Sequence, residues 1–358
     1  MTHLKKGHRQ RITIIDEKGK EREPYVEGFD PIAFHFTESY LSYANNRKIL
    51  NDYKDEMDPR VIEYWKSFGV KKELFDQDTL GKYSVHTPLD MDYSKRYPVL
   101  YYSHGGNGTP YEAETVGFSK LIQKEQFIAV YPFNEGYSNE EAPTEFKRIM
   151  DELKKKNIPI DWSRVYVSGY SSGSDASESI ATLWPEMVAA VAPCSGSNAM
   201  YNSLCRVTPE SYNKCLDIQV PLLCVGGNMD FGDPFPFPDK ECYENFNIWA
   251  KEISKVSNYV PLSFEDSRLL INTTTNPTKK NVGLDFKHTW TEEFEDREWY
   301  FGEFYDDKHR PVIQFIIGDG IPHITSGIHA SLVYAWLKQW SRDLETNELL
   351  FTPFFPYE

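Results

Sequence analysis

The sequence predicts an α/β fold in which helices cover both faces of a mostly parallel central sheet. Uninterrupted apolar runs of strand length recur from residue 82 onward, and such runs are typical of strands that are buried on both faces. Helical segments separate several of these runs, which favours parallel strands joined by crossovers. Polar or glycine-rich loops follow the strands, at the edge where sheets of this kind collect their chemistry.

The predicted elements follow one another regularly after a less regular start. Within residues 1–81 we expect a short strand at Ile12–Ile15 and a helix that begins at Asp58 and Pro59, because a capping aspartate followed by proline is a common helix start. The later strands are predicted at 82–88, 98–103, 127–132, 165–169, 188–196, 220–227 and 312–318, with helices around 143–155 and 328–340. The chain therefore divides into an N-terminal extension, residues 1–81, packed on a main α/β domain, residues 82–358, with an insertion at about 232–310.

Composition and charge exclude several classes of protein. The 358 residues carry a formal net charge of −15, and an acidic surface repels the phosphates of nucleic acids. No apolar stretch reaches the ~18 residues that a membrane span needs. The basic N-terminus lacks the apolar run of a secretory signal, so we expect a cytoplasmic protein, although a trimmed signal stays an alternative. The sequence does not indicate an oligomeric state.

Five cysteines give no metal-binding spacing, and we expect neither a metal nor a cofactor. Cys194 and Cys224 lie in apolar runs and are interpreted as core residues. Cys205 and Cys215 would form a loop disulfide if the protein were exported, but reduced thiols are the default for a cytoplasmic protein.

The segment Gly169-Tyr170-Ser171-Ser172-Gly173 is the strongest functional signal. It has the pattern G-x-S-x-G and lies between the predicted strand VYVSG and a helix-like run of small residues. A serine on a sharp turn from strand to helix needs small neighbours, because the backbone is crowded there. We therefore interpret Ser171 as a nucleophile whose hydroxyl is exposed above the sheet.

A serine hydroxyl becomes a good nucleophile when a base removes its proton. In the chain order of nucleophile, acid and histidine, His323 fits as the base because DGIPH follows the last strand. His329 is the rival, but it falls among the residues of the closing helix. Asp230 follows the strand VPLLCVGG and is favoured as the acid that orients the imidazole, and Asp233 stays a candidate close by.

Glycines also follow an early strand, in the segment His104-Gly105-Gly106-Asn107-Gly108. Backbone N–H groups can approach a substrate oxygen closely where no side chain intervenes. The N–H of Gly106, or that of Gly105, is therefore expected to pair with the N–H of Ser172 and hold a developing oxyanion. We expect His104 to brace this loop.

Together these motifs resemble α/β-hydrolase esterases, and the most similar group is the polyhydroxybutyrate depolymerases and feruloyl-esterase-like enzymes. The resemblance rests on IDWSRVYVSGYSSGS, VAAVAPCSG and YPVLYYSHGG and covers roughly residues 82–230 and 311–341. It implies an α/β-hydrolase fold, a catalytic triad of Ser171, Asp230 and His323, and Gly106 with Ser172 as oxyanion donors. Ser174 departs from the pattern, since such enzymes usually carry glycine there.

These observations predict a carboxylic-ester hydrolase that works through an acyl-enzyme, on hydroxycinnamoyl or short acyl esters of small molecules or carbohydrates. Two alternatives stay open. One is a peptidase of the prolyl-oligopeptidase type, which shares the order of the triad, and the other is a hydrolase-like scaffold that binds partners without catalysis.

The insertion is rich in aromatic residues. Phe231–Asp239 combines phenylalanine with proline, and further aromatic residues follow at Trp290, Phe294, Trp299, Tyr300, Phe301, Phe304 and Tyr305. This segment is expected either to cover the site with an aromatic wall or to pack on the sheet edge as a β-hairpin.

Overall fold

The computed structural model describes residues 57–76, 81–106, 110–133, 141–196, 215–230, 237, 239–273, 282–294, 297–325 and 327–353, with the short pairs 14–15 and 21–22. Its strands are β1 (Ile14–Ile15), β2 (Glu21–Arg22), β3 (Val70–Phe75), β4 (Tyr83–Pro88), β5 (Tyr97–Ser103), β6 (Ile128–Pro132), β7 (Ile160–Tyr170), β8 (Ala190–Cys194), β9 (Leu222–Met229), β10 (His288–Phe294), β11 (Arg297–Phe304), β12 (Ile313–Pro322), β13 (Trp340–Arg342) and β14 (Leu349–Phe351). Its helices are α3 (Pro59–Ser67), α4 (Pro110–Thr115), α5 (Phe118–Glu125), α6 (Glu141–Lys155), α7 (Ser172–Leu183), α10 (Lys240–Ile248), α11 (Phe264–Thr273) and α12 (Gly327–Leu337), and a π-helical turn η1 (Trp249–Ile253) continues α10.

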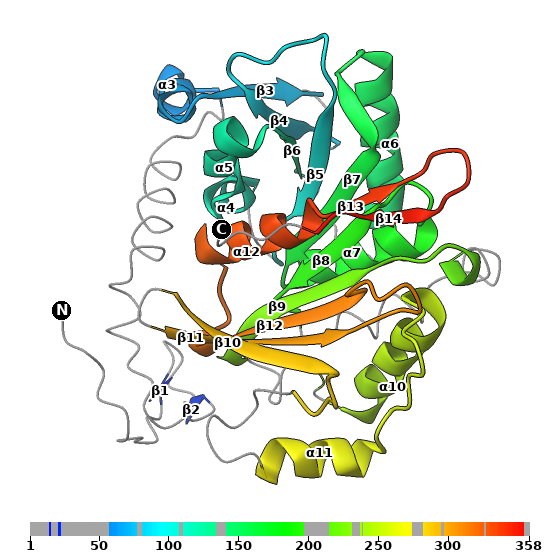
Figure 1. Cartoon of the computed structure of the whole chain (residues 1–358). Helices are drawn as coiled ribbons and strands as arrows, with labels where there is room; N and C mark the ends of the chain where they lie inside the picture. Colours follow the sequence, from blue (N-terminus) through cyan, green and yellow to red (C-terminus); the bar gives the residue numbers. More distant parts are fainter. Residues whose placement is uncertain are drawn as a thin grey trace.

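Ten strands form one sheet in the order β10-β11-β12-β9-β8-β7-β5-β6-β4-β3. Neighbouring strands from β12 to β6 are parallel. At one edge β4 runs antiparallel to β6 and β3, and at the other β10 and β11 form an antiparallel hairpin. Figure 1 shows α6 and α7 on one side of the sheet, with α5 and α12 on the other. The predicted fold class is therefore confirmed.

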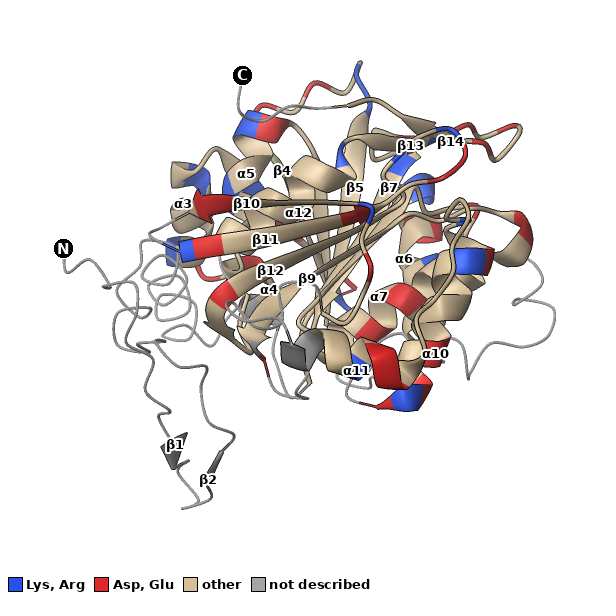
Figure 2. Ribbon diagram, turned by 60° about the horizontal axis from the view of Figure 1, so that its bottom comes forward, with Lys and Arg blue, Asp and Glu red and all other residues tan. Residues whose placement is uncertain are grey.

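The central strands are buried because their side chains are apolar on both faces. In β6 and β8 every residue is buried, and in β5 only Pro98 is partly exposed. Figure 2 shows the charged residues gathered on the outer helices and loops, whereas the interior strands are almost free of them. Burial on both faces of the sheet is the pattern from which these strands were predicted.

The helix predicted at Asp58 begins there as expected. The Asp58 carboxylate accepts a hydrogen bond from the Arg60 N–H, and Pro59 is the first helical residue of α3. The chain then enters β3, which is hydrogen-bonded to β4 in the main sheet. Residues 70–75 of the predicted N-terminal extension are thus part of the same sheet as the predicted main domain.

A buried ion pair joins this edge strand to α4. The Lys72 Nζ lies 2.8 Å from the Glu114 carboxylate, and both side chains are fully buried. The Ser84 hydroxyl donates to the same carboxylate at 2.8 Å, and the His86 Nε2 lies 3.6 Å from it. Burial acts to raise the pKa of Glu114, but the charges of Lys72 and His86 lower it to about 2. The pair therefore fixes α4, the helix that follows the glycine-rich loop after β5.

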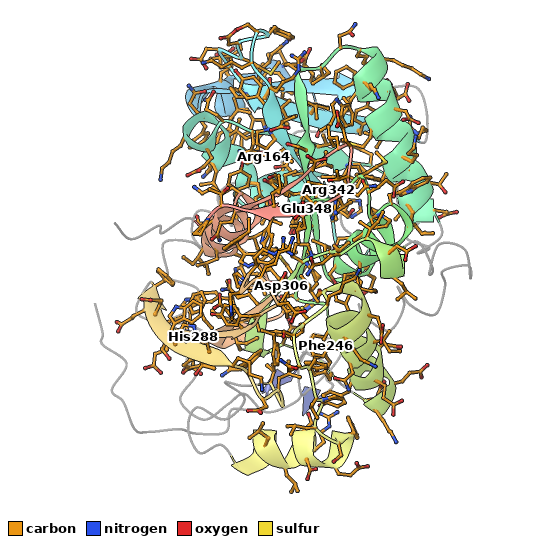
Figure 3. The ribbon with its side chains drawn as sticks, turned by 45° about the vertical axis from the view of Figure 1, so that its right-hand side comes forward. Arg164, Phe246, His288, Asp306, Arg342 and Glu348 are labelled. Atoms are coloured by element: carbon orange, nitrogen blue, oxygen red, sulfur yellow. The ribbon has the colours of Figure 1, made fainter. Side chains whose placement is uncertain are left out.

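At the C-terminal end, Arg342 fixes the β13–β14 hairpin against the sheet. Its guanidinium is 1% exposed and donates to the carbonyls of Val188 and Gln219, each at 2.8 Å from Nη2. These carbonyls lie just before β8 and β9. Arg342 is labelled in Figure 3. Burial lowers the pKa of its guanidinium to about 10.

The described part of the insertion contains α10, η1 and α11 and ends in the β10–β11 hairpin, which lies on the edge of the sheet. Trp290 stacks on Phe301 with ring centroids 4.7 Å apart, and β11 is hydrogen-bonded to β12. The aromatic residues of 290–304 therefore pack at the sheet edge, which corresponds to the second of the two expectations for this segment. Most of Phe231–Asp239 lies outside the described residues.

Two other sequence predictions concern cysteines and membranes. Cys194 and Cys224 are buried in the core, as predicted. Cys205 lies outside the described residues, so neither the expected reduced thiol nor the alternative Cys205–Cys215 disulfide is tested. Among the helices that the structure describes, none has both the length and the apolar character needed to cross a bilayer.

Candidate active site

Ser171 lies on a sharp turn between β7 and α7. Its φ of 55° and ψ of −120° are strained for a residue with a side chain. A Cβ atom on Gly169 would lie 2.1 Å from the Gly173 carbonyl oxygen, and one on Gly173 would lie 2.2 Å from that of Ser103. Both positions therefore require glycine. The crowded backbone holds the serine at the carboxyl end of the central strand β7.

Three side chains from distant parts of the chain meet at this edge. The His323 Nε2 lies 3.0 Å from the Ser171 Oγ, and its Nδ1 lies 2.6 Å from the Asp230 Oδ1. They follow β7, β9 and β12, whose carboxyl ends share one edge because these strands are parallel. The structure thus brings together the serine, histidine and aspartate that the sequence singled out.

The contact with Asp230 sets the tautomer of the His323 ring. Asp230 is 5% exposed, and its backbone N–H donates to the Gly227 carbonyl at 3.1 Å, which closes the turn after β9. An ionised carboxylate can only accept hydrogen bonds, so Nδ1 of His323 carries the proton. Nε2 is then the acceptor that faces the Ser171 hydroxyl, which is the tautomer that a general base needs.

The rival residues are placed differently. His329 lies on α12, is 1% exposed, and packs edge-on against Trp299 with ring centroids 5.2 Å apart. Burial lowers the pKa of His329 to about 3. It is a core residue of the closing helix. Asp233 lies outside the described residues, so the structure does not compare it with Asp230.

The glycine-rich loop after β5 lies against the start of α7. A Cβ atom on Gly106 would lie 3.3 Å from the Ser172 Oγ, and one on Gly105 would lie 3.3 Å from the Ser171 Cβ. Ser172 is the first residue of α7, and N–H groups in the first turn of a helix have no partner within the helix. The positive end of the helix dipole also favours negative charge there. The buried His104 ring donates from Nδ1 to the Gly105 carbonyl at 2.9 Å, in line with its expected bracing role.

Tyr170 is a site residue that the sequence analysis did not identify. Its hydroxyl donates to the His323 carbonyl at 2.8 Å, and its ring lies 4.8 Å from the imidazole. A Cβ atom on Gly105 would lie 2.9 Å from the same ring. Tyr170 therefore contacts both the histidine segment and the glycine-rich loop. The only sequence signal was an aromatic residue at the first variable position of G-x-S-x-G.

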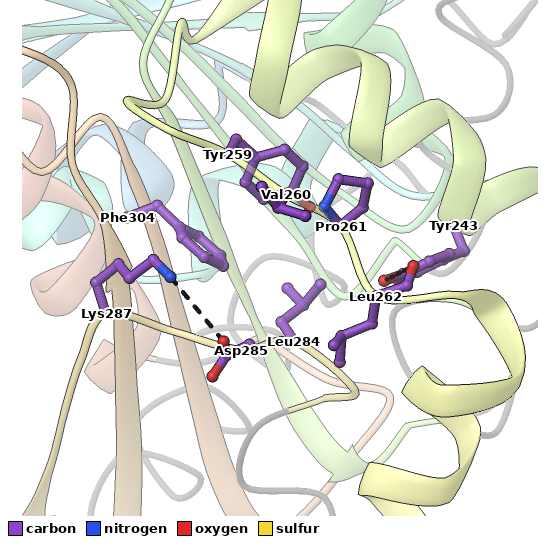
Figure 4. A pocket seen from close by; sticks show the side chains of 9 residues that line it. All are labelled: Tyr243, Tyr259, Val260, Pro261, Leu262, Leu284, Asp285, Lys287 and Phe304. Carbon is purple, nitrogen blue, oxygen red and sulfur yellow. Dashed lines mark hydrogen bonds and ion pairs between the residues drawn. The ribbon is translucent and has the colours of Figure 1, made fainter.

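A small depression elsewhere on the surface contains none of these residues. Tyr243, Tyr259, Leu284 and Phe304 line it together with an Asp285–Lys287 ion pair of 3.9 Å, as Figure 4 shows. Phe304 pairs with Ile313 at the start of β12, so the depression lies toward the sheet edge opposite Ser171.

In the described ranges, no cluster of three or more potential metal ligands occurs.

The sheet order, the strained turn at Ser171 and the three side chains after β7, β9 and β12 define an α/β-hydrolase fold with a serine-histidine-aspartate site. No protein-family model matches the chain. It is 28% identical over 158 residues to a bifunctional acetylxylan esterase/xylanase of Neocallimastix patriciarum. The aligned segment covers 42% of this chain and 20% of that protein. It is also 28% identical over 127 residues to the poly(3-hydroxyalkanoate) depolymerase C of Paucimonas lemoignei, 31% of this chain and 30% of the relative.

These relatives confirm the resemblance to esterases and depolymerases, although the chain spans less than a third of the length of either one. Among solved structures, the acetyl xylan esterase from Aspergillus awamori aligns with a TM-score of 0.48 at 14% identity. That alignment covers 75% of this chain and 99% of the esterase.

Proposed function

We propose that the chain is a serine esterase that hydrolyses carboxylic esters through an acyl-enzyme. The observation that carries the proposal is the hydrogen-bonded series from Ser171 through His323 to Asp230, with distances of 3.0 and 2.6 Å. The same arrangement occurs in hydrolases with unrelated folds because it solves one chemical problem, the activation of a weak nucleophile. Two relatives named as an acetylxylan esterase/xylanase and a depolymerase support it.

In the proposed first step, the Ser171 Oγ attacks the ester carbonyl carbon as its proton moves to the His323 Nε2. Asp230 stabilises the imidazolium that forms. The carbonyl oxygen becomes an oxyanion, which the backbone N–H groups of Ser172 and Gly106, or of Gly105, stabilise by roughly 3–4 kcal/mol per donor. When the tetrahedral intermediate collapses, the C–O bond to the alcohol breaks, and the proton on Nε2 passes to the departing oxygen.

The second step repeats this chemistry with water. His323 takes a proton from a water molecule, whose oxygen attacks the acyl carbon. The tetrahedral intermediate then releases the carboxylic acid, and the proton returns from Nε2 to the Ser171 oxygen. Atoms and charges balance without a redox partner, and the named side chains supply every proton transfer. The proposed substrates are short acyl esters, including esters on carbohydrates, as the name of the acetylxylan esterase relative suggests. Hydroxycinnamoyl esters are proposed as well, because the sequence resembles feruloyl-esterase-like enzymes.

The proposal is tested with a fluorophosphonate probe and a panel of p-nitrophenyl and hydroxycinnamoyl esters. We expect wild-type protein to be labelled and Ser171→Ala to lose both labelling and about a millionfold in kcat, as when a triad serine is removed elsewhere. Ser331→Ala is the matched control, because Ser331 is an exposed serine on α12 whose hydroxyl donates to the Gly327 carbonyl of its own helix. Wild-type protein that is folded but neither labelled nor active would instead favour a non-catalytic scaffold. Cleavage of proline-containing peptides but not esters would favour the peptidase.

A further inference from the structure

The last strand contains a bulge just before His323. Gly318 on β12 pairs with Gly227 on β9, and the next pair joins Pro322 to Met229. Three residues of β12 therefore lie opposite a single residue of β9, Asn228, which leaves β12 two residues longer over this stretch. Bulges of this kind occur next to active sites, where they redirect a side chain.

The bulge decides whether His323 can reach Asp230. With Pro322 opposite Met229, His323 comes beside Asp230, and the two side chains form their 2.6 Å contact. If the two extra residues were extended along the strand instead, His323 would move roughly 6–7 Å past Asp230, at about 3.3 Å per residue. A hydrogen bond does not survive such a shift. The catalytic contact thus depends on the register of two strands.

The side chain of Asn228 holds the bulge at two points. Its Nδ2 donates to the Asp319 Oδ1 at 2.7 Å, and its Oδ1 accepts from the Gly320 N–H at 2.8 Å. Asn228 is 4% exposed, so water does not compete strongly for these bonds. Gly320 has a φ of +68°, which glycine adopts without strain.

The bulge also packs closely against the neighbouring backbone. A Cβ atom on Gly227 would lie 1.8 Å from the Ile321 carbonyl oxygen, so the bulge packs directly on β9. The Arg297 Nη1 also donates to the Asp319 carbonyl at 3.4 Å, from β11 on the other side of β12. Asn228 lies on β9, the strand that Asp230 follows. From there it bonds both to the backbone and to a side chain of the bulge. Strands β9 and β12 are neighbours in Figure 1.

We propose that Asn228 is a positioning residue, which sets the hydrogen bond between His323 and Asp230 by fixing the bulge at Asp319 and Gly320. Its two side-chain hydrogen bonds go to Asp319 and Gly320, and not to Ser171, His323 or Asp230. This inference rests on the proposed esterase function, because it assigns Asn228 to the same site. It predicts that Asn228 affects the chemical step and leaves substrate binding nearly unchanged.

The experiment replaces one atom group at a time. Asn228→Asp keeps the shape of the side chain but replaces the donor with an oxygen that faces the Asp319 carboxylate. We expect kcat to fall about 10–100-fold, because a displacement of about 1 Å at the reacting groups can cost roughly a hundredfold in rate, with KM changed less than about twofold. The downfield proton NMR signal of the His323 Nδ1–H should shift or disappear. Combining Asn228→Asp with Asp319→Asn restores one donor and one acceptor, and we expect it to recover most of kcat and the signal.

Gln314→Glu is the matched control. Gln314 is buried on the same strand β12 and donates to the Glu303 carboxylate, so the substitution also places two carboxylates together, but at the end of β12 far from His323. We expect Gln314→Glu to lower the stability of the protein. Its kcat, calculated per protein molecule that the fluorophosphonate probe labels, should be unchanged. Should Asn228→Asp fail to fold, Asp319→Ala at a partly exposed position serves in its place, with a several-fold lower kcat expected at constant KM.

Three outcomes would overturn the proposal. These are a wild-type kcat and NMR signal in folded Asn228→Asp, no recovery in the double variant, and an equal loss of kcat in Gln314→Glu. Failure of the proposed function is separate from these, because wild-type protein itself would then show no fluorophosphonate labelling and no ester turnover.

Discussion

The burial of His329 should make the stability of the protein fall in mild acid. This imidazole is 1% exposed and burial lowers its pKa from an ordinary value of 6.5 to about 3. In the unfolded chain the same group binds a proton as the pH falls below 6.5, whereas the folded protein does not protonate it until about pH 3. Acid therefore favours the unfolded state, so the stability linked to His329 is complete above pH 6.5 and is lost between pH 6.5 and 3.

The size of the effect follows from the two pKa values. At about pH 5 the unfolded imidazole is mostly protonated, which lowers the free energy of unfolding by about 2 kcal/mol, whereas at about pH 7.5 the effect is below ~0.1 kcal/mol. His329→Phe removes the titrating group and keeps an aromatic ring against Trp299. The change in packing caused by His329→Phe alters the free energy of unfolding equally at both pH values. This contribution therefore cancels when the two pH values are compared. Burial also lowers the pKa of His86, but His86 is present in both proteins and cancels as well.

The assay is urea unfolding followed by tryptophan fluorescence, for both proteins at both pH values. Wild-type protein should lose about 2 kcal/mol more than His329→Phe on going from about pH 7.5 to about pH 5. The same loss in the two proteins would show that the folded state takes up a proton at His329, and that the reasoning from burial is wrong. Unequal slopes of free energy against urea would show instead that the substitution changes the extent of unfolding.

Two further predictions concern residues that support the site. Tyr170→Phe removes only the hydroxyl that donates to the His323 carbonyl, and we expect kcat for p-nitrophenyl acetate to fall roughly fivefold, since such a bond contributes about 1 kcal/mol; an unchanged kcat would contradict the role given to it. Lys72→Met leaves the Glu114 carboxylate buried without its ion-pair partner, and urea unfolding should show a loss of roughly 3–5 kcal/mol. Combining it with Glu114→Gln should restore part of that loss, and a double variant as unstable as the single one would exclude the ion pair as the cause.

The parts of the site that the sequence predicted are those with local signals. Ser171 was found because the turn that exposes it needs glycine at two positions close in the sequence, Gly169 and Gly173. His323 and Asp230 were found because each follows the carboxyl end of an apolar strand. In a parallel sheet those ends share one edge, so residues far apart in the chain are predicted to meet without knowledge of their contacts.

The parts that the sequence did not predict depend on pairing between distant segments. Asn228 acquires its role from the offset between β9 and β12, which lie about 90 residues apart in the chain. No local pattern records that offset. Lys72 lies in VKKELF, which has the polar composition of an exposed edge strand, and it is buried only because α4 brings Glu114 over it.

The geometry of this site is therefore determined mainly by the backbone. Glycine contacts below 2.5 Å to a hypothetical Cβ fix the turn at Ser171 and the packing of the bulge at Gly227. Strand register then places His323 beside Asp230. A substitution that adds a Cβ at Gly169, Gly173 or Gly227 would displace main-chain atoms. Ser171, His323 and Asp230 would then move with the backbone. Because a displacement of about 1 Å can cost roughly a hundredfold in rate, we expect these glycines and Asn228 to affect the rate of the proposed reaction without contacting its reacting atoms.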